Sequence, residues 1–273
     1  MTYATFILST GRCGTQWIAQ TFSSIYSDLL HVEHEPLHDR YHARNLLGWR
    51  DYGNASEKLS KECLEHLDEI EQILQTQSYL ECGHPVWSLV PYLAWRFHGR
   101  IRMIHLVRHP VPTSCSWLTH QAYVPPLLPY LKEKVFLSPF DEGVRFHDYQ
   151  EQWDRLHPYE KCLYYWGEVN QFALDQEKSL DVPWFRLYYE DLFHGKGLES
   201  LLQFLELPSR ETVFNQIDQT VDRFRYLSPV WQDWRMIKNH PQIMGVAHEL
   251  GYQLEEIEEA ILRQRYLMAG QDS

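Results

Sequence analysis

Short apolar segments of strand length alternate with helical stretches along the chain, and this alternation most constrains the fold. The strand candidates are Thr5–Leu8, Leu29–Val32, Tyr79–Cys82, Ile101–Val107 and Trp184–Tyr188. The clearest helical stretch runs from Ser56 to Gln77, where apolar residues recur every three or four positions. This pattern predicts an α/β fold with a central, mostly parallel sheet flanked by helices. Ligands of such sheets bind at the carboxyl ends of the strands.

No repeat, low-complexity tract or Gly/Ser linker interrupts the sequence, so we predict one domain over residues 1–273. One segment breaks the alternation: four prolines lie between Tyr123 and Tyr149, where they exclude a long regular helix. Loops of this length inside a compact domain are usually functional. We therefore expect an insertion at about residues 123–149 that covers a bound ligand as a lid. The alternative is an ordered surface excursion.

Composition narrows the classes of function. The formal net charge of −12 argues against a general nucleic-acid-binding protein, which needs a basic surface. Apolar runs fall short of the roughly 18 residues that cross a bilayer, and the first residues lack the basic region of a signal peptide. We therefore predict a cytoplasmic protein with no membrane partner. The five cysteines are scattered and indicate reduced thiols rather than a zinc site.

The turn after the first strand is a candidate phosphate-binding loop. It reads Thr10-Gly11-Arg12-Cys13-Gly14-Thr15-Gln16-Trp17. Glycines let backbone N–H groups approach an anion, and the start of a helix adds partial positive charge. Arg12 supplies a formal charge and Thr15 a hydroxyl. The loop is not a Walker A motif, because no lysine follows Gly14, and this disfavours a nucleoside triphosphate with magnesium. The alternative is a plain strand–turn–helix junction.

A second phosphate site is predicted where the strand Ile101–Val107 ends. Arg108 follows this strand directly, and Pro110 suits the first turn of a helix. Ser116 lies about two helical turns further on. A guanidinium at the strand end and a hydroxyl from the helix would converge on one phosphate, to which arginine gives bidentate contacts.

Together the two segments resemble the PAPS-dependent sulfotransferase family, in its bacterial and carbohydrate-acting branch with a P-loop-like fold. The first segment is similar to the family loop G-x-x-[RK]-S-G-T, and Arg108 with Ser116 is similar to its R-x₇-S motif. Arg186–Leu192 looks like the family's R-Y-E-D-L segment, and Ala247–Tyr252 like its closing segment. The departures are Cys13, where serine is commoner, and Gln16 in place of a second Thr or Ser.

The resemblance implies that the chain binds PAPS, 3′-phosphoadenosine 5′-phosphosulfate, and releases adenosine 3′,5′-bisphosphate without a metal. Arg108 and Ser116 would hold the 3′-phosphate, and Tyr189 would lie near the adenine. The residues of the 5′-phosphosulfate loop would be Arg12, Cys13, Gly14, Thr15, Gln16 and Trp17. A thiol next to Arg12 at a helix start is in a setting that lowers its pKa. In-line sulfuryl transfer nevertheless needs no nucleophile from the enzyme.

The acceptor must lose a proton, so a general base is expected beside Arg12, which would stabilise charge on the leaving phosphate. Glu35 looks like the glutamate of the E-P segment in carbohydrate and bacterial sulfotransferases and is our first choice. His84 is the alternative, because cytosolic steroid and phenol sulfotransferases place a catalytic histidine after this strand. The acidic, aromatic composition suits a small cationic natural product as acceptor. The competing functions are an ATP-dependent small-molecule kinase and a nucleotide-binding homologue without activity.

Overall fold

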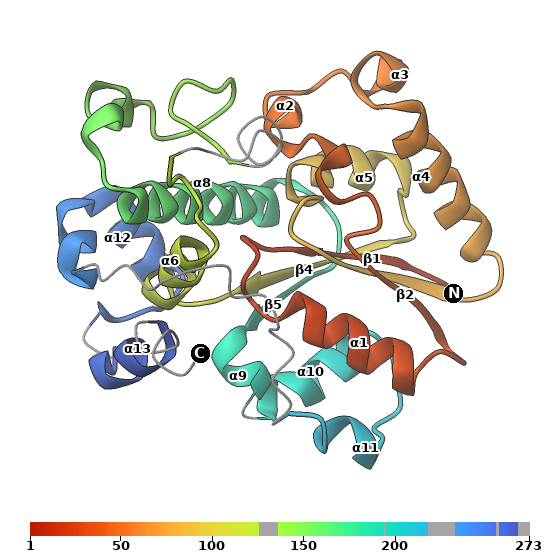
Figure 1. Cartoon of the computed structure of the whole chain (residues 1–273). Helices are drawn as coiled ribbons and strands as arrows, with labels where there is room; N and C mark the ends of the chain where they lie inside the picture. The colour runs from red at the N-terminus through yellow and green to blue at the C-terminus, as the bar shows by residue number, and fades with distance from the viewer. Residues whose placement is uncertain (126–135, 194, 218–232, 255–256, 267–273) are drawn as a thin grey trace.

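The computed structural model describes residues 1–125, 136–193, 195–217, 233–254 and 257–266. Five strands form one sheet in the order β2-β3-β1-β4-β5, and every pair is parallel (Figure 1). They are β1 (Ala4–Leu8), β2 (Leu30–His34), β3 (Ser78–Cys82), β4 (Ile101–Val107) and β5 (Trp184–Tyr188). The prediction of a single α/β domain with a mostly parallel sheet is therefore confirmed.

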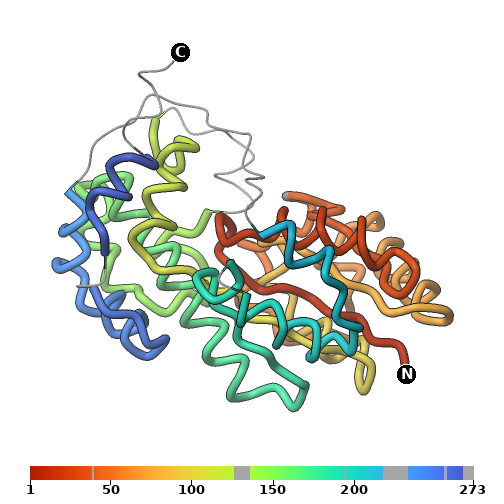
Figure 2. The backbone as a smooth tube through the Cα atoms, turned by 90° about the horizontal axis from the view of Figure 1, so that it is seen from below, coloured from red at the N-terminus to blue at the C-terminus, as the bar shows by residue number. Residues whose placement is uncertain are grey.

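Helices cover both faces of the sheet (Figures 1 and 2). On the upper face of Figure 1 lie α4 (Lys61–Ile73), α5 (Val90–Arg96), α6 (Pro110–Thr119), α8 (Pro158–Ser179) and α12 (Pro241–Glu249). On the lower face lie α1 (Thr15–Ile25), α9 (Tyr189–Phe193), α10 (Lys196–Phe204) and α11 (Glu211–Phe214). The remaining helices are α2 (Ala43–Leu46), α3 (Ala55–Lys58) and α13 (Glu259–Tyr266).

The central strands are buried on both faces, which explains their mostly apolar sequences. All five residues of β1 and all seven of β4 are buried. Successive side chains of a strand point to opposite faces, so Phe6 and Leu8 join the upper core while Ile7 joins the lower one. The burial of both strands is typical of the middle of a parallel sheet.

The predicted helix Ser56–Gln77 is wrong in being continuous and in its end, because the structure breaks it at Leu59 and Ser60 and ends α4 at Ile73. Helix α3 stops at Lys58, and Leu59 adopts an extended conformation. Ser60 then caps α4, because its hydroxyl accepts a hydrogen bond from the backbone N–H of Cys63 at 3.1 Å. The serine thus offers the backbone an alternative to continuing the helix. The amphipathic face itself is retained in α4.

Both described ends of the 123–149 segment are fixed to the upper core. The Tyr123 hydroxyl donates to the Leu137 carbonyl at 2.6 Å, and its ring stacks on Phe136 with 4.8 Å between centroids. Further along, the Glu168 carboxylate accepts the backbone N–H groups of Arg145 and Phe146. The tip of the proposed lid, residues 126–135, lies outside the described residues, so the lid stays a prediction.

Candidate active site

Each of the five strands delivers one predicted site residue to the same edge of the sheet. Glu35, Arg108 and Tyr189 follow β2, β4 and β5 directly, while Arg12 and His84 lie in the turns after β1 and β3. Because all strands run parallel, their carboxyl ends meet at one edge. Residues that are scattered in the sequence therefore gather where ligands of parallel sheets bind.

The loop after β1 has an unusual backbone. Gly11, Arg12 and Gly14 have positive φ angles of 74°, 61° and 92°. A Cβ on Gly11 would lie 2.8 Å from the Trp117 ring and 3.0 Å from the His84 ring, so only glycine fits there. Arg12 is not a glycine, and its left-handed conformation is energetically costly. Such strain concentrates where function demands a particular geometry.

Hydrogen bonds join the two predicted phosphate sites. Arg12 Nε donates to Ser116 Oγ at 2.9 Å, and Arg108 Nη1 donates to the backbone carbonyl of Arg12 at 2.8 Å. The Arg108 guanidinium also lies over the Tyr189 ring, 4.3 Å from its centroid. Arg108 and Ser116 are 5% and 3% exposed. The loop after β1 and the β4–α6 junction therefore form one continuous, electropositive site.

Two loop residues turn their side chains away from this site. Cys13 is fully buried, and its thiol donates to the Gly11 carbonyl at 3.0 Å. The expected lowering of its pKa is wrong: burial raises the pKa of the Cys13 thiol to about 11, outweighing the nearby arginines. The Trp17 ring packs on Phe193 in the lower core, and its indole N–H donates to the Gln216 carbonyl at 2.9 Å. Its side chain therefore anchors α1.

The other loop residues form the start of α1. Gly14 occupies the N-cap position, and Thr15 and Gln16 are the first two helical residues. The first N–H groups of a helix have no partner within it and attract anions. This end of α1 thus has the local chemistry expected of a phosphate site.

The two candidate bases contact each other. His84 Nδ1 lies 2.8 Å from Glu35 Oε1, although 49 residues separate them. Gly83 makes this approach possible, because a Cβ there would lie 2.7 Å from Glu35 Cγ. Burial alone would raise the pKa of Glu35, but the charge and hydrogen bond of His84 outweigh it, and the pKa falls to about 2. The carboxylate is therefore ionised, and His84 Nδ1 carries the proton that it accepts.

The second ring nitrogen of His84 is unpaired among the described residues. His84 Nε2 is buried without a hydrogen-bond partner among the described residues. The His84 ring packs edge-on against Trp117, whose indole N–H donates to the Thr10 carbonyl at 3.0 Å. Buried polar atoms are nearly always paired, so an unpaired one indicates a catalytic role or a missing ligand. The Nε2 atom thus remains open to a ligand beside the phosphate-binding loop.

Sequence reasoning missed three residues that complete the site. Tyr266 accepts a hydrogen bond from Arg108 Nη2 at 2.7 Å, and Arg265 donates to the Tyr189 hydroxyl at 3.2 Å. Both lie beyond the last motif, and their sequence carries no signal for this contact. Glu190 accepts from the backbone N–H of His109 at 3.2 Å. The acidic segment after β5 could have suggested a structural carboxylate there.

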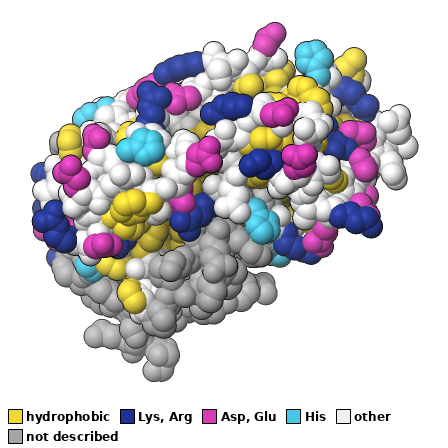
Figure 3. Space-filling view, turned by 90° about the horizontal axis from the view of Figure 1, so that it is seen from above, with side chains coloured by type: hydrophobic (Ala, Val, Ile, Leu, Met, Phe, Trp, Pro, Cys, Tyr) yellow, Lys and Arg dark blue, Asp and Glu magenta, His cyan; other side chains and the backbone are white. Residues whose placement is uncertain are grey.

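The surroundings of the site bear on which ligands it can bind. In the described part of the chain, no group of three or more His, Cys, Asp and Glu side chains is arranged to hold a metal ion. Of the helices that the structure describes, none is both long and apolar enough to cross a membrane. Acidic and basic side chains are interspersed over the face seen in Figure 3. In the site itself, positive charge for an anionic ligand comes from the buried Arg108 and the half-buried Arg12.

The fold is a single α/β domain whose candidate site lies at the carboxyl edge of its parallel sheet. The family model described as "Sulfotransferase domain" matches residues 3–227. The chain therefore belongs to the sulfotransferase family, and the family resemblance drawn from its motifs is confirmed. No curated protein sequence matches it significantly.

A solved structure shares the fold. The sulfotransferase domain from the curacin biosynthetic pathway aligns with a TM-score of 0.53 at 16% identity, covering 93% of this chain and 99% of that one. Mouse sulfotransferase SULT7A1, complexed with PAP, aligns with a TM-score of 0.47 at 15% identity, covering 96% and 89%. The first of these likenesses supports a shared architecture over nearly the whole chain.

Proposed function

We propose that this protein transfers a sulfuryl group from PAPS to a hydroxyl or amine of a small-molecule acceptor. One observation carries the proposal: Arg108 and Arg12 are joined through the Arg12 carbonyl, and Arg12 also holds Ser116. PAPS carries its two anionic groups on one ribose, at the 3′ and 5′ positions, so it needs two neighbouring sets of hydrogen-bond donors. The glycine turn and the β4–α6 junction supply both in one site.

The residues fit this donor in distinct roles. The loop amides and Arg12 would stabilise negative charge that develops on the leaving 5′-phosphate, which is where catalysis of such transfers mainly arises. Arg108 and Ser116 would hold the 3′-phosphate. Tyr189, stacked on Arg108, would lie beside the adenine. PAPS itself supplies the sulfuryl group.

The base in this proposal is His84, with Glu35 as its positioning residue. The Glu35 carboxylate accepts the proton on His84 Nδ1 and thereby presents the Nε2 lone pair. The acceptor oxygen or nitrogen forms a bond to sulfur while the sulfur–oxygen bond to the 5′-phosphate breaks. The electron pair of that bond stays on the phosphate, and the acceptor's proton passes to His84 Nε2. This assignment reverses our first choice of Glu35, because the Glu35 carboxylate already accepts from His84 Nδ1, whereas His84 Nε2 has no partner among the described residues.

The acceptor class is the least constrained part of the proposal. A net charge of −12 favours a cationic small molecule over a polyanionic polymer. A cytoplasmic natural-product pathway would supply such a molecule. A screen of hydroxyl- and amine-bearing cationic compounds with labelled PAPS would identify the acceptor.

Calorimetric binding of nucleotides tests the donor. Arg108→Ala should weaken the binding of adenosine 3′,5′-bisphosphate by about 100-fold, since a charge-assisted contact to the 3′-phosphate is lost. The affinity for adenosine 5′-monophosphate should fall much less. Arg102→Ala is the matched control, because Arg102 lies on the same strand but donates to the Phe204 carbonyl. Equal losses for both ligands at Arg108→Ala, or tighter binding of ATP with magnesium by the wild type, would contradict the proposal.

A further inference from the structure

Helix α13 lies against the donor site, although it belongs to none of the matched motifs. The sequence resemblance ends at Tyr252 and the family model at residue 227, whereas α13 spans Glu259–Tyr266. Figure 2 shows this helix (dark blue) running beside α6 at the carboxyl edge of the sheet. A helix outside the family pattern thus reaches the residues that are expected to bind the nucleotide.

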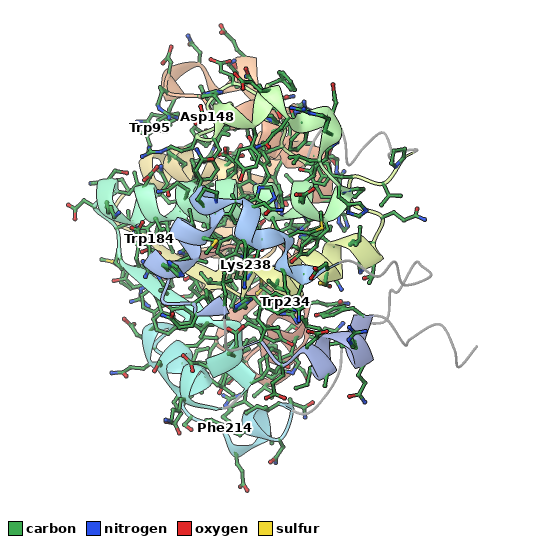
Figure 4. The ribbon with its side chains drawn as sticks, turned by 90° about the vertical axis from the view of Figure 1, so that its left-hand side faces the viewer. Trp95, Asp148, Trp184, Phe214, Trp234 and Lys238 are labelled. Atoms are coloured by element: carbon green, nitrogen blue, oxygen red, sulfur yellow. The ribbon has the colours of Figure 1, made fainter. Side chains whose placement is uncertain are left out.

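The helix is held in place at its start and in its middle. Glu259 accepts hydrogen bonds from Arg235 Nη2 at 2.6 Å and from Trp234 Nε1 at 3.3 Å; Trp234 is labelled in Figure 4. Leu262 is 7% exposed and packs into the upper core. The position of α13 is therefore fixed independently of its last residues.

The last two residues of α13 contact the donor site. Arg108 Nη2 donates to the Tyr266 hydroxyl at 2.7 Å. Since the hydroxyl oxygen accepts this bond, its own proton remains for a second partner. Arg265 Nη2 donates to the Tyr189 hydroxyl at 3.2 Å, which brings a second guanidinium to the ring that stacks on Arg108. A hydroxyl donor and a cation thus flank the arginine assigned to the 3′-phosphate.

We infer that Tyr266 and Arg265 are further donor-binding residues, specific to nucleotides that carry a 3′-phosphate. Tyr266 positions the Arg108 guanidinium and donates its hydroxyl proton to the 3′-phosphate. Arg265 adds positive charge to the same phosphate, which matters in a chain whose overall charge is −12. This inference rests on the proposed function, because it assumes that the site holds an adenosine bisphosphate.

Titrations of the full chain with adenosine 3′,5′-bisphosphate and adenosine 5′-monophosphate test the inference. Tyr266→Phe should weaken the binding of the bisphosphate about tenfold, because one hydrogen bond to a charged group is lost. It should leave the affinity for the monophosphate little changed. Arg265→Ala should weaken the bisphosphate as well, and the loss should shrink at high salt. Gln264→Ala, an exposed residue on the same helix, should change neither ligand. Thermal unfolding of each variant without ligand verifies that α13 stays folded.

The outcomes separate the two proposals. Wild-type protein that binds the monophosphate as tightly as the bisphosphate overturns the proposed function and this inference together. If the wild type prefers the bisphosphate and both Tyr266→Phe and Arg265→Ala keep that preference unchanged, the inference alone is overturned. Tighter bisphosphate binding by either variant also overturns it, because α13 would then obstruct the site instead of contributing to it.

Discussion

At the scale of single residues, two residues of the site have a strained backbone conformation. Arg12 and Glu35 both have positive φ angles, 61° and 47°, which cost non-glycine residues about 1 to 3 kcal/mol. Each is held by a neighbour: Arg108 donates to the Arg12 carbonyl, and His84 donates to the Glu35 carboxylate. The strain therefore coincides with the contacts to which we assign donor binding and proton transfer.

The pairing of Glu35 with His84 leads to an ordered set of kinetic effects. His84→Ala should lower kcat by about 10²- to 10⁴-fold, the usual worth of a positioned general base. Glu35→Gln should cost less, because the amide oxygen still accepts the Nδ1 proton while the charge is lost. Turnover is measured with PAPS and the acceptor found by screening.

Donor affinity should be unchanged in both variants. His38→Ala serves as control, since His38 Nδ1 lies 3.7 Å from the same carboxylate but is exposed. A large loss in Glu35→Gln beside a small one in His84→Ala would return the role of base to Glu35.

At the scale of elements, the start of α6 depends on an uncharged histidine. His109 is the N-cap, and its Nδ1 accepts the backbone N–H of Val111 at 3.2 Å. Burial is the main cause that lowers the pKa of His109 to about 4, and the Arg108 charge acts in the same direction. Protonation would remove the lone pair that caps the helix. The helix that carries Ser116 is therefore most stable when His109 is neutral.

This titration predicts a pH window for stability. The folded-state pKa of about 4 lies below the ordinary value of 6.5, so the unfolded chain binds the proton first as pH falls. The stability that neutral His109 contributes is complete above about pH 6.5 and declines toward pH 4, by about 3 kcal/mol in total. Urea unfolding at several pH values measures the decline.

The matched variant is His109→Asn, which caps a helix without titrating. Its stability should depend less steeply on pH between 6.5 and 4 than that of the wild type. Parallel curves for the two proteins would show that His109 does not titrate on unfolding.

The sequence predicted elements well where a local pattern defines them. Strand β4 was predicted with its observed limits, because its seven buried residues are apolar at every position except Arg102 and His105. The helix around α4 was misjudged, since periodicity does not reveal that Ser60 begins a new helix.

In the site, the loop at Arg12 and the Arg108–Ser116 pair were identifiable by motif. The contact between α13 and Arg108 spans 158 residues and has no local signature.

At the scale of the whole molecule, the sheet order decides which predicted residues meet. Placing β1 between β3 and β4 sets the turn after β1 beside both His84 and Arg108. Composition and spacing predict a parallel sheet but do not give the order of its strands. The choice between Glu35 and His84 therefore stayed open in the sequence, because only the fold shows that they touch.

The bond from Arg108 to the Arg12 carbonyl makes the two ends of the donor site thermodynamically coupled. Ser116 belongs to the same link, since its Oγ accepts from Arg12 Nε at 2.9 Å. Ser116→Ala should therefore weaken binding of adenosine 5′-monophosphate as well, by about two- to threefold, although Ser116 is assigned to the 3′-phosphate. Calorimetry at constant salt measures this, and an effect confined to ligands with a 3′-phosphate would show independent ends. By reciprocity, if binding of the sulfated end raises the affinity of the site for the 3′-phosphate, binding of the 3′-phosphate raises the affinity for the sulfated end by the same factor. Discrimination of PAPS from abundant adenine nucleotides would then be cooperative, with the turn after β1 set fully only when both ends are occupied.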